Sequence, residues 1–249
     1  RNCATAPATL KQQFARLQEW KDKQPHVPLY IWHYHCFPKE IANNGRFYCF
    51  PGFFAHELKK QFDYYCAVDV QGIFHCGFDG EVENYLSYKL MDDPSLDVDT
   101  LLDSYFAAYG PARKAMAAWY KLAESRYCDP SLIPTGPSGE PYNGHQTVRI
   151  AWEDLGNAGT MAALGSSMDE AKKSARGQAA RLVDLWDKGV WSYMQTGRET
   201  FVERMKAPIP SVVATRVPLA GGDPAKVDWH KGESLGNTWY LRGGDGPSR

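Results

Sequence analysis

The chain has 249 residues, enough for one large domain, and 43% of them are hydrophobic, so it can bury a sizeable core. Its 28 basic and 29 acidic side chains leave a formal net charge of −1, and no block of like charge stands out. This balance argues against nucleic acid or a membrane surface as the partner. No apolar run reaches the roughly 18 to 20 residues of a membrane-spanning helix.

The N-terminal third alternates helical and strand patterns. From Leu10 to Trp20, apolar residues recur at spacings of four, three and three, which predicts an amphipathic helix within 7–23 that starts at Pro7 or Thr9. The short apolar run "VPLYIWHY" at 27–34 predicts a strand that is covered on both faces. A long aromatic loop follows. The next helix and strand are expected at 54–68 and 70–76.

Three more helices are predicted after the second strand, separated at Asp92-Asp93-Pro94 and at Gly110-Pro111. The alternation of helices and strands is a repeating β/α unit, which requires a parallel sheet with helices outside it. Because two strands cannot complete such a sheet, we expect an α/β fold in which this chain forms the C-terminal part of a (β/α)8 TIM barrel. A whole barrel of this kind runs to about 250 residues.

The pattern changes after residue 127. Residues 128–146 are rich in Pro, Gly and Ser and predict a loop. Helical sequence follows, and Ser167 or Asp169 could cap the start of its alanine-rich helix. The last residues have short alternating runs and many glycines, as at the start of an all-β module. The predicted division is 1–127 for the barrel units, 128–146 for the loop, 147–207 for a helical extension and 208–249 for a linker and the start of a β-sandwich.

Polar side chains gather where the two predicted strands end. His33, Tyr34 and His35 end the first strand, and His75 and Cys76 end the second. In a parallel α/β sheet, ligands bind beyond the carboxyl ends of the strands, where the loops converge. We therefore expect the functional site at this edge.

The histidines at the strand ends admit three interpretations. His33 and His35 are two residues apart on a strand and share a face, so with His75 they could form a three-imidazole zinc site. They could instead hydrogen bond to sugar hydroxyls, or serve only in packing. The spacing of the residues does not decide between these roles.

Carboxylates near the second strand are candidates for acid and base catalysis. Glycoside hydrolysis usually uses two of them, and Asp79 and Glu81 are the best placed. Asp79 could equally cap the following helix, and Glu81 could simply favour the helix dipole in its first turn. Asp69 precedes the strand and is expected at the opposite end of the barrel, while Glu83 is expected on a solvated helix face.

The segment from Trp32 to Phe54 is unusually aromatic for a loop and its flanks. Aromatic rings such as those of Trp32 and Tyr48 could stack on pyranose faces, while Arg46 or Lys39 could meet a carboxylate or sulfate. The alternative is a lid with its own small core. The six cysteines show no zinc spacing, and isolated thiols are favoured over disulfides.

The run "GIFHCGFDGEVENYLSYKLMDDPSLDVDTLLDSYFAAYGPARKAMAAWYKLAE" resembles a bacterial family catalogued as domain of unknown function 4838, which is grouped with α-glucuronidase-like glycoside-hydrolase barrels. The shared features are the G-I-F strand, an acidic residue before a Y-L-x-x-K-L helix, the D-P-x-x-D-V-D turn and the Y-G-P-A helix start. "RNC", "LKQQFARLQEW" and "LYIWHYH" are also similar. The resemblance covers roughly residues 1–205, and the tail is similar to carbohydrate-binding β-sandwiches.

The resemblance implies a secreted or periplasmic glycoside hydrolase acting on a complex polysaccharide, which could contain acidic sugars. Glu81 matches an acidic position of the motif, whereas His75 stands where family members often have Glu, so the mechanism could differ. We expect no cofactor, and as partners a carbohydrate and the missing N-terminal part of the same barrel. The expected catalytic residues are Glu81 and Asp79, and the expected substrate-binding residues are His33, Tyr34, His35, His75, Trp32, Arg46 and Tyr48.

Two other functions fit the same residues. A non-catalytic carbohydrate-binding protein would keep the cleft but, with His75, lack one of the two carboxylates. A metal-dependent hydrolase would use His33, His35 and His75.

Overall fold

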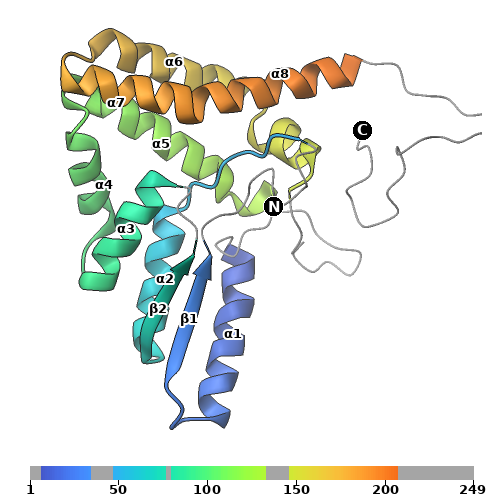
Figure 1. The fold of residues 1–249 in the computed structure, drawn as a ribbon. Helices are drawn as coiled ribbons and strands as arrows, with labels where there is room; N and C mark the ends of the chain where they lie inside the picture. Colours follow the sequence, from blue (N-terminus) through green and yellow to red (C-terminus); the bar gives the residue numbers. More distant parts are fainter. Residues whose placement is uncertain (1–6, 35–46, 77–79, 133–145, 207–249) are drawn as a thin grey trace, which may run out of the picture.

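The structure is a computed structural model that describes residues 7–34, 47–76, 80–132 and 146–206 (Figure 1). Helices and strands alternate through its first part, as the sequence predicts. These elements are α1 (Pro7–Lys23), β1 (Leu29–Tyr34), α2 (Ala55–Ala67), β2 (Val70–Cys76) and α3 (Glu81–Asp92).

The two strands form a parallel pair in which His33 lies opposite His75 and Trp32 opposite Phe74. This arrangement confirms an α/β organisation with a parallel connection through α2. Both arrows in Figure 1 point toward α5 (Arg113–Tyr127), so the carboxyl edge of the pair lies on the side of the later helices.

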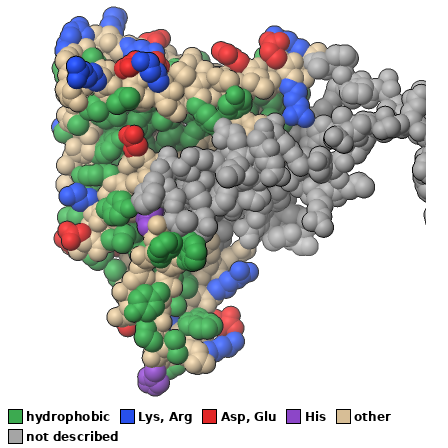
Figure 2. Space-filling view, viewed as in Figure 1, with side chains coloured by type: hydrophobic (Ala, Val, Ile, Leu, Met, Phe, Trp, Pro, Cys, Tyr) green, Lys and Arg blue, Asp and Glu red, His purple; other side chains and the backbone are tan. Residues whose placement is uncertain are grey.

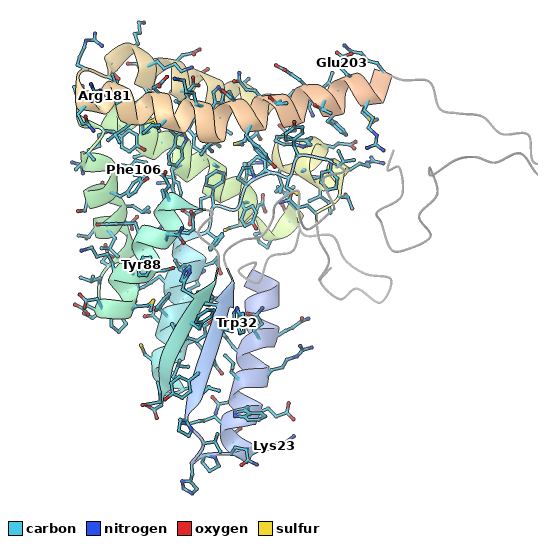
Figure 3. The ribbon with its side chains drawn as sticks, viewed as in Figure 1. Lys23, Trp32, Tyr88, Phe106, Arg181 and Glu203 are labelled. Atoms are coloured by element: carbon cyan, nitrogen blue, oxygen red, sulfur yellow. The ribbon has the colours of Figure 1, made fainter. Side chains whose placement is uncertain are left out.

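The two faces of the strand pair differ sharply in what covers them. Because side chains alternate along a strand, His33 and Ile73 share the face that packs against the helices. The opposite face carries Tyr30, Trp32 and Phe74, which are 69%, 64% and 61% exposed. Figure 2 shows hydrophobic side chains over the strands in this view, and Figure 3 places Trp32 among them. The expectation of a strand covered on both faces is therefore wrong for the residues that the structure describes.

The later part of the chain is helical. A layer of helices lies across the carboxyl end of the strand pair (Figure 1). In chain order it contains α4 (Val98–Ala107), η2 (Gly110–Ala112), α5, η3 (Pro130–Leu132), the π-helical turn η4 (Ile150–Leu155), α6 (Ala158–Ser174), α7 (Gln178–Trp186), the π-helical turn η5 (Asp187–Trp191) and α8 (Ser192–Lys206).

The start of α6 corrects the predicted helix cap. The Asn157 side chain accepts a hydrogen bond from the Thr160 N–H at 2.9 Å and caps the helix ten residues before Ser167 and twelve before Asp169. Ser167 and Asp169 lie inside α6. The alanine-rich run is instead interrupted after Ser174, and the chain turns at Gly177, whose φ of 57° is unfavourable for other residues.

Large aromatic side chains dominate the core between the helices. The Trp119 and Trp186 rings meet edge to face with centroids 5.3 Å apart, and Trp119 also contacts Phe53 at 5.4 Å. The same core includes Phe50 from the first part of the chain and Phe201 from α8. The helices after residue 147 therefore share one core with the elements before residue 128. Among the described helices, none has the length and apolarity that crossing a bilayer requires.

Gly197 provides a test of this packing. A Cβ added to Gly197 would overlap the ring of Trp152, which is fully buried and held by a hydrogen bond from its Nε1 to the Tyr48 carbonyl at 2.6 Å. We expect Gly197→Ala to lower the free energy of unfolding by about 1–3 kcal/mol, measured by urea denaturation. Gly189→Ala is the control, because a Cβ at Gly189 meets nothing within 4 Å. Equal stability of the two variants would contradict the packing described.

Candidate functional site

The histidines of the two strands lie side by side on the face of the sheet that packs against the helices. The ring centroids of His33 and His75 are 5.6 Å apart. The Nε2 of His33 lies 2.9 Å from Oε1 of Gln61 on α2, and because an amide oxygen only accepts, this nitrogen carries the proton. Tyr88 of α3, labelled in Figure 3, stacks on the His75 ring at 5.7 Å.

His33 is therefore directed toward α2, not toward the other face of the sheet, where an inward-facing H-x-H metal site would lie. Its side chain is 4% exposed, and burial, with a smaller effect from His75, lowers its pKa from 6.5 to about 4 despite the Gln61 hydrogen bond. The described residues contain no group of three His, Cys, Asp or Glu side chains able to hold a metal. His35, the third member of the hypothesised zinc site, lies outside them.

The predicted sugar-binding aromatics do not form one cluster. Trp32 is exposed and meets Phe74 edge to face, with ring centroids 5.0 Å apart. Tyr48 lies among the C-terminal helices, where its ring contacts Tyr193 of α8 at 5.2 Å. The Tyr34 side chain, Arg46 and Asp79 are outside what the structure describes.

Glu81 is the first residue of α3, five positions after Cys76, where β2 ends. Its side chain is exposed and accepts a hydrogen bond from the Tyr105 hydroxyl of α4 at 3.2 Å. Asp69, by contrast, precedes β2 and pairs with Lys21 of α1 at 3.5 Å. Of the two predicted catalytic carboxylates, Asp79 and Glu81, the structure describes Glu81. Glu81 follows the carboxyl end of β2, where a ligand is expected.

Glu83 contradicts the prediction of a solvated helix face, because its side chain is 1% exposed. The start of α2 and the Tyr120 side chain of α5 cover it. Its Oε1 accepts hydrogen bonds from the Phe54 N–H at 3.1 Å and the Tyr120 hydroxyl at 2.5 Å. The sequence did contain a signal, since Glu83, Leu86 and Leu90 share the helical spacing of a buried face.

The surroundings of Glu83 favour its protonated form. Burial raises the pKa of the Glu83 carboxyl from 4.5 to about 7, and the negative charge of Glu124 adds to this effect. The Tyr120 hydroxyl and the Phe54 N–H act in the opposite direction, because they donate to the ionised carboxylate. A carboxyl group that titrates near neutral pH is unusual outside functional sites.

A second buried glutamate lies close by. Glu124 of α5 accepts hydrogen bonds from the His56 N–H at 2.8 Å and pairs with its Nδ1 at 2.9 Å. The Nε2 of the half-buried His56 lies 3.4 Å from Asp99. The hydrogen bond to Glu124 raises the pKa of His56 above 6.5, and the charges of Glu124 and Asp99 add to this effect against burial. We call Glu83, Tyr120, Glu124 and His56 the carboxylate cluster.

Comparisons of the chain with family models, with curated proteins and with solved structures find no match. The geometry of the chain itself therefore carries the functional argument. It offers an exposed aromatic face on the strand pair, an exposed carboxylate, Glu81, at the start of α3, and a buried carboxylate cluster.

The lowered pKa of His33 predicts a loss of stability in acid. The unfolded chain takes up a proton at pH 6.5 while folded His33 resists protonation down to about pH 4, so stability falls across this window as pH decreases. The contribution is on the order of 3 kcal/mol. In His33→Gln, which keeps an amide donor for Gln61, this part of the pH dependence should be absent from urea denaturation series. Exposed His26 supplies the control variant His26→Gln, and an unchanged slope in His33→Gln would contradict the prediction.

Proposed function

We propose that the chain is the C-terminal part of a (β/α)-barrel glycoside hydrolase that acts on a complex polysaccharide outside the cytoplasm. The exposed aromatic face of the strand pair carries this proposal. Tyr30, Trp32 and Phe74 lie opposite the helix-covered face, where the strands of a barrel present side chains to its interior. The remaining strands, from the N-terminal part of the same barrel, would continue the sheet from its open edges.

Trp32 and Phe74 have the placement that a sugar site at the end of a barrel requires. They are paired in register, two residues before the last pair of the two strands, Tyr34 and Cys76. In a closed barrel their rings would lie below the loops of the carboxyl edge and present apolar surface to a pyranose ring. Uncharged aromatic surface with a few polar groups is typical of ligand sites.

Glu81 is the carboxylate that we assign to catalysis. It lies at the carboxyl edge, is open to solvent and is oriented by the Tyr105 hydroxyl. Glycoside hydrolysis needs a second carboxylate. In the proposed protein this group comes from Asp79 or from a strand of the N-terminal part.

Replacing Glu81 by Gln tests the catalytic assignment. We expect Glu81→Gln to lower kcat at least 100-fold on the polysaccharide that the wild type hydrolyses. The side-chain amide can act neither as a general acid or base nor as a nucleophile toward the sugar. Binding of that polysaccharide should persist. Glu170→Gln on the exposed side of α6 is the matched control. Full activity of Glu81→Gln would remove the assignment.

The aromatic face is tested by binding. We expect Trp32→Ala to weaken polysaccharide affinity roughly tenfold in isothermal titration calorimetry, because its ring supplies stacking surface. Leu185→Ala is the control, since Leu185 is equally exposed on α7. Binding by the wild type without any hydrolysis would favour the non-catalytic carbohydrate-binding function. Unchanged affinity of Trp32→Ala would show that the aromatic face is not the polysaccharide-binding surface.

A further inference from the structure

The Glu83 carboxyl group lies at the N-terminal ends of two helices. It is the third residue of α3, and a Cβ added to Gly80, the N-cap of that helix, would overlap a carboxylate oxygen of Glu83. The side chain is thus folded back over the start of its own helix, as in a capping box. Its Oε1 also accepts the N–H of Phe54, the N-cap of α2. Both helix dipoles therefore direct their positive ends at this group.

The groups around Glu83 do not include a compensating positive charge among its described partners. Its hydrogen-bond donors are the Tyr120 hydroxyl and backbone N–H groups, which are neutral. The charge that acts on it is that of Glu124 of α5, which has the same sign. His56 of α2 is engaged by Glu124 and by Asp99 of α4. Burial and the charge of Glu124 thus favour the protonated form of Glu83, whereas the two helix N-termini favour the ionised form. The balance between these effects determines whether Glu83 holds a proton.

We propose that Glu83 is a pH-dependent positioning residue, which takes up and releases a proton inside the folded protein and thereby changes its hold on the first turns of α2 and α3. The ionised group is the stronger acceptor for the Phe54 N–H and for the N-terminal turn of α3. That turn carries Glu81, so the orientation of Glu81 follows the state of Glu83. This last step rests on the proposed function, whereas the titration of Glu83 does not.

The raised pKa of Glu83 determines how the stability of the folded protein changes with pH. The pKa of Glu83 is about 7 in the folded protein and 4.5 as its ordinary value, so the folded state holds the proton more tightly. Stability from this group is complete below pH 4.5 and is lost as pH rises to 7 and beyond, which raises the equilibrium constant of unfolding by about two orders of magnitude. His56 contributes in the same direction, because its pKa is also raised.

The first test is independent of activity. Carbon-13 NMR of the glutamate side-chain carboxyls, with Glu83→Gln assigning the missing signal, should give a midpoint for Glu83 near neutral pH in the whole chain. Urea denaturation from pH 5 to 8 should show a steeper loss of stability in the wild type than in Glu83→Gln. Glu170→Gln on exposed α6 should keep the wild-type slope. A midpoint near 4.5 for Glu83 would overturn the proposal. If Glu83→Gln does not fold, a wild-type spectrum in which no glutamate carboxyl has a midpoint near neutral pH would overturn it equally.

Tyr120→Phe adds a second, graded variant. Removing the hydroxyl takes away a donor to the ionised carboxylate, so the Glu83 midpoint should move to higher pH. If the protein hydrolyses a polysaccharide, the pH profile of kcat should shift in the same direction, with little change in KM. A shifted NMR midpoint with an unshifted kcat profile would overturn the coupling to Glu81 but leave the titration of Glu83. A protein without hydrolytic activity would remove the proposed function alone.

Discussion

The hydrogen bonds of one buried carboxyl group tie together three helices that are far apart in sequence. Glu83 belongs to α3, accepts the N–H at the start of α2 and is bonded by Tyr120 of α5. Both α2 and α3 begin directly beyond the carboxyl edge of the strand pair, so this contact determines how that edge meets the helical layer above it. One turn further along α5, the carboxylate of Glu124 likewise accepts a backbone N–H from the start of α2, that of His56.

The aromatic core extends this junction into the helical layer. Tyr120 is the link, because its hydroxyl is bonded to Glu83 while its ring contacts Phe53 and Phe106 with centroids 5.7 Å away. From there Trp119 and Trp186 continue the core toward α7. Unlike an apolar core alone, this junction contains an ionisable group at its centre, and burial raises the pKa of the Glu83 carboxyl to about 7.

The parts of the structure that were predictable from the sequence are those determined by neighbours along the chain. The apolar run of 70–76 predicted β2 to the residue, and the periodicity within 7–23 predicted α1 with its start at Pro7 or Thr9, because helical and strand patterns are local. The cap of α6 at Asn157 was missed because several polar residues fit the local rule. The burial of Glu83 depends on Tyr120, 37 residues away, and no local pattern announces that partner.

The strand register separates residues that look equally functional in the sequence. Adjacent positions of a strand point to opposite faces, so His33 is buried against α2 while Trp32 beside it is exposed. The same holds for His75 and Phe74, since each is paired with its counterpart across the sheet. The sequence placed His33, His75 and Trp32 together as substrate-binding residues, but the alternation puts the histidines and Trp32 on opposite faces of the strand pair. The imidazoles join the strand pair to its helices, and the aromatic rings are left to meet whatever the uncovered face contacts.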